Sequence, residues 1–134
     1  MPFMVKQKTY MLQTNLLVAE IISCAIEVHK ALGPGLLESA YEACLCRELE
    51  LRNIPFRRQA PLTFDYKGMT IDCAYRMDIV VAESVLLELK SVDQVHPIHE
   101  AQIISYLKLS KLKQGLLINF NVQLLKDGLQ SFLN

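Results

Sequence analysis

The sequence has no excess of charge of either sign, since 14 Lys and Arg residues balance 14 Asp and Glu residues. No global field therefore draws the protein to a polyanion, and any binding of phosphate groups must be local. Although 51% of the residues are hydrophobic, no apolar run approaches the roughly 20 residues that a membrane-spanning helix requires. We therefore do not expect a membrane protein.

Three further absences narrow the class of protein. The N-terminal segment 1–13 has no apolar core followed by a cleavage site, so we expect a cytoplasmic rather than a secreted protein. No repeat, low-complexity tract or linker divides the chain, and we expect residues 1–134 to form a single domain. The cysteines lack metal-site spacing and are expected to be small buried hydrophobic residues; they are Cys24, Cys44, Cys46 and Cys73.

Hydrophobic periodicity predicts three helices. Polar residues recur every three or four positions over 15–32, which is typical of a largely buried helix, and Gly33-Pro34-Gly35 ends it. The same period predicts helices over about 36–52 and about 96–112. Each of these segments is long enough for a helix that packs on a sheet.

The pattern between and after these helices predicts strands. Alternation with a period of two, broken by turn signals, indicates three consecutive antiparallel strands. One more apolar run reads as a buried strand, and the C-terminal segment 121–134 is ambiguous. The expected strands cover residues 61–66, 69–81, 85–90 and 115–120. The resulting order is helix, helix, three strands, helix, strand, in one α/β domain.

Three charged residues lie where these strands should face a packed interior. A loop of three residues, 82–84, would place Asp78 directly opposite Glu88, and alternation puts Glu88 and Lys90 on one face. A loop of two residues would instead pair Asp78 with Leu89 and separate the carboxylates, so the inference depends on register. Facing carboxylates about 5 Å apart repel unless one is protonated or a cation lies between them.

The donor atoms favour a hard divalent cation, Mg²⁺ or Mn²⁺, over zinc. The ligands would be oxygens, and segment 76–91 contains neither His nor Cys. Such an ion can polarise a phosphoryl oxygen and acidify a water, while an ammonium orients that water or offsets developing charge. The pattern therefore indicates phosphodiester hydrolysis, and an internal salt-bridge cluster of the same three side chains is the structural alternative.

The arrangement of Asp78 and Glu88-Leu89-Lys90 resembles the PD-(D/E)XK nuclease superfamily, which has an acidic residue on one strand and E-x-K on the next. The predicted element order over about 36–120 is similar to the superfamily core. The resemblance implies an α/β fold (an α+β sandwich) with a restriction-endonuclease-like core of helix, three antiparallel strands, helix and strand, after an extra N-terminal helix. It also implies that the Leu89 backbone carbonyl completes the coordination of the metal.

Segment 35–41, GLLESAY, resembles more specifically the bacterial GxxExxY group of that superfamily. This resemblance gives Glu38 a role as a further acidic contact to the metal, direct or through water. From the sequence alone, Glu38 is equally a carboxylate favoured in the first turn of a helix. Tyr41 shares its face and is expected to position Glu38, and with it the substrate, or to pack beside it. Further matches within about residues 21–127 are Tyr75-Arg76, Ala101-Gln102, Tyr106-Leu107 and segment 115–120.

Gln102 and Tyr106 lie four residues apart on one predicted helix and so share a face. They resemble the Q-x-x-x-Y motif of the exonuclease-like branch of the superfamily, in which Gln and Tyr contact substrate or support the metal site. A polar helix edge beside a core tyrosine is the alternative. His99 is expected to join that face, His29 to cap or pack near a helix C-terminus, and His96 to lie on the surface.

Basic residues form two groups that are candidates for phosphate contact, although a solvated face is the common explanation for such runs. The first group is Arg52, Arg57, Arg58 and Lys67, and the second is Lys108, Lys111 and Lys113. Neither group predicts recognition of a base sequence.

We therefore hypothesise a divalent-metal-dependent nuclease acting on DNA or RNA. Asp78 and Glu88 would bind the metal, Lys90 would position water and stabilise charge, and Glu38 would be an auxiliary acid. The alternative is a non-catalytic nucleic-acid-binding or protein-interaction module that retains the fold. Because a small neutral domain has little surface for a duplex, a homodimer through the apolar first helix is a further expectation.

Overall fold

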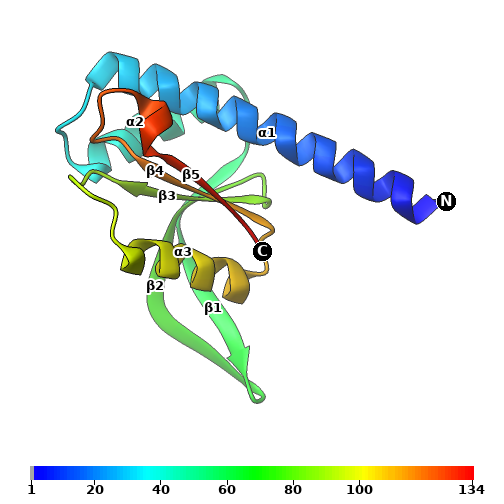
Figure 1. Cartoon of the computed structure of the whole chain (residues 1–134). Helices are drawn as coiled ribbons and strands as arrows, with labels where there is room; N and C mark the ends of the chain where they lie inside the picture. The colour runs from blue at the N-terminus through cyan, green and yellow to red at the C-terminus, as the bar shows by residue number, and fades with distance from the viewer. Residues whose placement is uncertain (1) are drawn as a thin grey trace.

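The computed structural model describes the backbone of residues 2–134 and the side chains of residues 14–72 and 75–134. The side chain of Cys73 lies outside the described residues, so its predicted burial is not tested. The described chain forms helices on both sides of a five-stranded sheet (Figure 1). Its elements are α1 (Pro2–Leu32), α2 (Glu38–Leu51), β1 (Phe56–Tyr66), β2 (Met69–Val81), β3 (Val85–Lys90), α3 (Pro97–Ser110), β4 (Gln114–Asn119), the 3-10 helix η1 (Leu125–Gly128) and β5 (Leu129–Leu133).

The sheet has the order β1-β2-β3-β4-β5. Neighbouring strands are antiparallel except β3 and β4, which are parallel and joined through α3. Helices α1 and α2 cover one face and α3 covers the other (Figure 1). This arrangement confirms the predicted α/β sandwich, in which a helix, three antiparallel strands, a helix and a strand follow an extra N-terminal helix.

Two hydrophobic cores flank the sheet because strand residues alternate between its faces. Ile21 of α1 and Leu45 of α2 pack with Leu87 of β3 on one side. Ile103 of α3 packs with Leu86 of β3 on the other side. The central strand β3 is therefore buried on both faces, which explains its nearly continuous apolar sequence.

The cysteines contribute to the first core. Cys24 and Cys46 are buried, as predicted, and Cys44 is half-buried against the same cluster. Burial raises the pKa of the Cys46 thiol to about 11, so this side chain is a neutral hydrophobic group at pH 7. Among the described residues, no helix is both long and apolar enough to cross a lipid bilayer.

Helix α1 is longer than its hydrophobic pattern predicts, because it begins at Pro2 rather than at residue 15. Proline suits the first helical position, and the Met, Lys and Gln residues that follow it favour helix. The N-terminal part of α1 extends past the edge of the sheet (Figure 1). The periodic pattern starts only at residue 15, so periodicity gives no signal for the earlier turns of α1.

Strand β1 also begins earlier than predicted, at Phe56 instead of Pro61. In the structure β1 is an edge strand, and the register shifts between Pro61 and Thr63. Proline is tolerated at such an irregularity on a sheet edge.

The ambiguous C-terminal segment forms η1 and then β5, which pairs antiparallel with β4. Gly128 lies at the joint, where a Cβ atom would collide with the carbonyl oxygen of Asn119. Only glycine therefore lets the chain turn back so closely along β4. Five strand residues after a tight turn give too short a pattern to be recognised in the sequence.

Candidate active site

The candidate site lies where β2 and β3 diverge. Their ladder runs from the pair Val81 and Val85 to the pair Ile79 and Leu87, which is the register that a three-residue loop predicts. The next residues along each strand are Asp78 and Glu88. This register brings the two carboxylic side chains together at the end of the ladder.

Side chains replace the main-chain ladder at this point. The Leu89 N–H donates to Asp78 Oδ2 at 2.8 Å, and the Asp78 N–H donates to Glu88 Oε1 at 3.4 Å. Each carboxylate thus accepts from the backbone of the opposite strand. The two acidic groups are held between the strands by the fold itself, and neither depends on a flexible loop.

Burial makes this carboxylate pair electrostatically costly. Glu88 is only 5% exposed, and burial followed by repulsion from Asp78 raises its pKa to about 9. Burial likewise raises the pKa of Asp78. At pH 7 the pair therefore retains a proton.

Lys90 does not neutralise these carboxylates by direct pairing. The ion pairs formed among the described residues join Arg47 to Glu50, Arg57 to Glu83 and Arg58 to Glu42, and none involves Lys90. Lys90 is half-buried at the end of β3, and alternation puts it on the same face as Glu88. Its charge lowers the pKa of both carboxyls, but less than burial raises them. The internal salt-bridge cluster, which was the structural alternative, is therefore not formed.

Helix α2 provides the wall of the site on one side. A cavity of about 220 Å³ is lined by Glu38, Ser39, Glu42, Gln59, Asp78 and Leu89. Glu38 is the first residue of α2 and is exposed at this cavity, as its position in the first turn predicts. The cavity therefore brings Glu38 together with Asp78 and Leu89.

Helix α3 provides the other wall. Gln102 Nε2 donates to the Tyr106 hydroxyl at 3.0 Å, so these two side chains share a face as expected. Burial, and then the charge of Glu88, raises the pKa of Tyr106. The ring of Tyr75 lies 5.9 Å from that of Tyr106, and both line a hollow of about 510 Å³ with His99 and Gln102.

His99 lies at the N-terminal end of α3, near the charge of Lys90. Its Nδ1 accepts from the backbone N–H of His96, which caps the helix. Burial and then the charge of Lys90 lower the pKa of His99. His99 is therefore neutral at pH 7, and His96 is exposed as expected.

Tyr41, which was predicted to position Glu38 and with it the substrate or to pack beside Glu38, is a core residue. It is fully buried and stacks on Phe120 with ring centroids 4.4 Å apart. Its hydroxyl donates to the Gly33 carbonyl at 2.6 Å and accepts from the Leu36 N–H at 3.1 Å. A buried side chain cannot touch a substrate, so Tyr41 instead clamps the loop that leads into α2 and presents Glu38.

We expect Tyr41→Phe to lower the free energy of unfolding by about 1–3 kcal/mol, because it removes two part-buried hydrogen bonds, one to the Gly33 carbonyl and one from the Leu36 N–H. The stack on Phe120 is retained, so the change isolates the hydroxyl. Urea titration followed by circular dichroism measures the effect. Tyr66→Phe, at a 58% exposed tyrosine, is the control and should change stability by less than about 0.5 kcal/mol. Equal stability of the two variants would contradict the clamp.

The first basic group does not form one phosphate-binding cluster. Arg52 donates to Ser23 and to a backbone carbonyl of α1, whereas Arg57 donates twice to Glu83. Arg58 donates through Nε to Glu42 Oε2 at 2.8 Å. In the second group, Lys108 and Lys111 line a separate hollow beside the β1–β2 hairpin.

Two residues that line the site, Glu42 and Gln59, were not predicted from the sequence. Glu42 lies four residues after Glu38, and this helical spacing would have indicated a shared face. Gln59 lies in β1 with a left-handed φ of 51°, which has no signal in the sequence. Both line the cavity beside Asp78.

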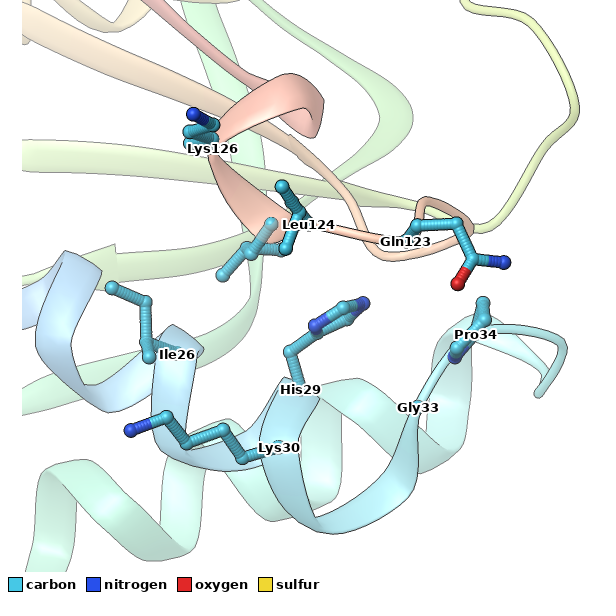
Figure 2. Close-up of a pocket in the computed structure, with 9 residues that line it drawn as sticks. Ile26, His29, Lys30, Gly33, Pro34, Gln123, Leu124 and Lys126 are labelled. Carbon is cyan, nitrogen blue, oxygen red and sulfur yellow. The ribbon is translucent and has the colours of Figure 1, made fainter.

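A larger hollow of about 560 Å³ lies between the end of α1 and the loop before η1 (Figure 2). Its lining includes Ile26, Pro34 and Leu124, with Lys30 and Lys126 at the edge. His29 packs here and its Nε2 lies 2.8 Å from the Val122 carbonyl oxygen, as its predicted packing role requires. No carboxylate belongs to this lining among the described residues, so the hollow does not suit hydrolysis.

Comparison with known families gives one match. The family model of the PD-(D/E)XK nuclease superfamily matches residues 15–132, which include all the elements that build the site. The element order agrees with a restriction-endonuclease-like fold. No curated protein and no solved structure gives a significant match.

Proposed function

The chain belongs to the PD-(D/E)XK nuclease superfamily, and we propose that it is a divalent-metal-dependent nuclease that hydrolyses phosphodiester bonds in DNA or RNA. The observation that carries this proposal is the pair of half-buried Asp78 and buried Glu88, which forms no ion pair with a basic side chain among the described residues. Segment 35–41 supports a place in the GxxExxY group. Membership of that group is part of the proposal.

Asp78 and Glu88 would hold the metal, together with the Leu89 backbone carbonyl and, directly or through water, Glu38. Among the described residues, no three His, Cys, Asp or Glu side chains are arranged to hold an ion. A site with two carboxylates and a backbone carbonyl suits Mg²⁺ or Mn²⁺ better than zinc, because Mg²⁺ is usually bound by one or two carboxylates plus waters and substrate oxygens. When bound, the ion supplies a Lewis acid that polarises a phosphoryl oxygen and lowers the pKa of water.

The chain's own groups divide the remaining work. Lys90 extends from the same face as Glu88. Because it forms no ion pair with any residue that the structure describes, its ammonium is available to orient a water and offset charge on the phosphate. Gln102 and Tyr106 hold each other on α3 and would contact the substrate strand with His99. Tyr41 acts indirectly, through the loop that presents Glu38.

The proposal predicts metal-dependent cleavage of at least one nucleic acid. Labelled single- and double-stranded DNA and RNA are incubated with Mg²⁺, Mn²⁺ or EDTA and separated on denaturing gels. Asp78→Asn should lower the rate roughly 1000-fold, because the ion contributes several kcal/mol of charge stabilisation. Asp127→Asn, at an exposed aspartate of η1, should cleave like the wild type.

If the wild type binds nucleic acid but cleaves none of the four substrates with either metal, the chain is instead a non-catalytic binding module. Two broader expectations also stay predictions of the sequence. They are self-association through α1, which sedimentation velocity measures, and a cytoplasmic location.

A further inference from the structure

Glu42 lies in the wall of the site, but both of its oxygens are already engaged. It is buried at 8% exposure. Arg58 Nε donates to Oε2 at 2.8 Å, and Gln59 Nε2 donates to Oε1 at 2.6 Å. Such hydrogen bonds to a carboxylate are short and about twice as strong as those between neutral groups. Glu42 therefore anchors two consecutive residues of β1 beside the cavity that contains Asp78.

The backbone of β1 is bent at this anchor. Gln59 has φ 51°, between Arg58, which pairs with Ile79, and Ala60, which pairs with Met77. This register puts Gln59 opposite Asp78. A non-glycine residue in this conformation costs of order 1–3 kcal/mol and persists only where the surroundings enforce it.

The bend changes which way β1 presents its side chains. Residues 58 and 60 would share a face in a regular strand, yet Arg58 contacts Glu42 on α2 whereas Ala60 packs in the core under α3. Arg58 and Gln59 consequently both reach Glu42 on α2, and Gln59 also lines the cavity. The contacts with Glu42 offset the cost of the bend.

Arg58 has free donors of fixed orientation. Its side chain is 45% exposed while that of Glu42 is 10% exposed, so the pair has one buried and one accessible end. Only Nε is engaged, and the two terminal nitrogens have no partner among the described residues. Arg57, the preceding residue, instead donates hydrogen bonds to Glu83 from two of its nitrogens. A guanidinium fixed at one edge with free N–H groups at the other fits a phosphate.

We propose that Arg58 binds a backbone phosphate of the nucleic-acid strand in the site, and that Glu42 and Gln59 are positioning residues that orient it. The inference rests on the proposed nuclease function, since it names how the same site holds its substrate. Contacts to phosphate position a strand without reading its bases. Arg58 therefore contributes affinity for any sequence.

The test measures binding of fluorescein-labelled single-stranded DNA and RNA by anisotropy in EDTA, over a series of salt concentrations. Arg58→Ala and Arg57→Ala each remove one cation and one ion pair from adjacent, exposed positions. Arg58→Ala should weaken binding about tenfold and reduce the slope of log K against log salt by about 0.7. Arg57→Ala should leave both quantities close to those of the wild type.

Two further variants separate positioning from folding. Arg58→Lys keeps a cation for Glu42 but lacks the spare coplanar donors, so it should fold normally and still lose most of the affinity. Glu42→Gln should weaken binding in the wild-type background and have no effect in the Arg58→Ala background, because it acts through Arg58. Melting temperatures of all variants are recorded beside the binding curves.

Equal affinities and salt slopes for the Arg57 and Arg58 variants would overturn the phosphate contact. A Glu42→Gln effect that persists in the Arg58→Ala background would overturn the positioning role. The proposed function fails by a different result, which is a wild type that never cleaves. If the wild type cleaves nucleic acid but Arg58→Ala leaves the affinity and the salt slope unchanged, only the present inference is wrong.

Discussion

Lys90→Ala should remove most of the cleavage activity while metal binding remains close to that of the wild type. Lys90 lies on the same face of β3 as Glu88 and forms no ion pair among the described residues, so its charge is available to the reacting phosphate. Stabilisation of transition-state charge of this kind is typically worth roughly 100- to 1000-fold in rate. Single-turnover cleavage at saturating Mg²⁺ measures the loss, and calorimetric titration with Mn²⁺ measures metal binding.

The control is Lys108→Ala, which removes an exposed cation from α3 away from the carboxylates. It should cleave at nearly the wild-type rate. Undiminished cleavage by Lys90→Ala would leave a nuclease whose catalytic lysine we have misassigned. Loss of metal binding together with cleavage would instead make Lys90 a structural support of the carboxylate pair.

Glu88→Gln should abolish stabilisation by metal and yet make the metal-free protein more stable at high pH. The folded protein raises the pKa of Glu88 from 4.5 to about 9, chiefly through burial. A group whose pKa is raised by folding contributes its stability below the unfolded pKa, and that contribution is lost as pH rises through the folded pKa. On this account the wild type loses stability between about pH 4.5 and about pH 9.

The amide of the variant resembles the protonated acid and does not titrate. The stability of Glu88→Gln relative to wild type should therefore grow with pH, by up to about 1.4 kcal/mol per pH unit in this window. Chemical denaturation in EDTA at several pH values measures the difference, and the same series with Mn²⁺ measures the stabilisation by metal. Glu27→Gln, at an exposed glutamate of α1, should follow the wild type throughout. A Glu88→Gln protein less stable than wild type at pH 8 in EDTA would show that the charged carboxylate is favoured, which is the opposite of our account.

The hairpin that carries Asp78 and Glu88 could be predicted from sequence because its information is local. Strands β2 and β3 have the predicted bounds, and the loop at residues 82–84 fixes the register that joins the carboxylates. Alternation then puts Glu88 and Lys90 of β3 on one face, since its period is two. A chemical site that depends on one hairpin is within reach of pattern analysis.

The remainder of the site depends on contacts between distant segments. Gln59 is held in a left-handed conformation by a glutamate of α2, and no local pattern encodes a strained residue that tertiary contacts enforce. Glu42 could have been found from its spacing with Glu38, but not its two partners on β1. Tyr41 was expected to position Glu38 or to pack beside it, and only the structure shows that its hydroxyl contacts the loop before α2.

The motif in segment 35–41 now has a structural explanation for its three defining residues. Gly35 adopts a φ of 99°, which favours glycine. Tyr41 ties the loop together through its hydroxyl, and Glu38 opens α2 at the edge of the cavity. The motif thus describes a clamped loop that presents one carboxylate, and Tyr41→Phe tests it without touching that carboxylate.

The position of the metal is the central claim, and anomalous scattering from crystals grown with Mn²⁺ tests it most directly. The account predicts a peak between the carboxylates of Asp78 and Glu88, within coordinating distance of both and of the Leu89 carbonyl oxygen. Crystals of Asp78→Asn grown in the same way should lack that peak. A cleavage-competent protein whose Mn²⁺ lies elsewhere, with Asp78 and Glu88 uncoordinated, would contradict the account.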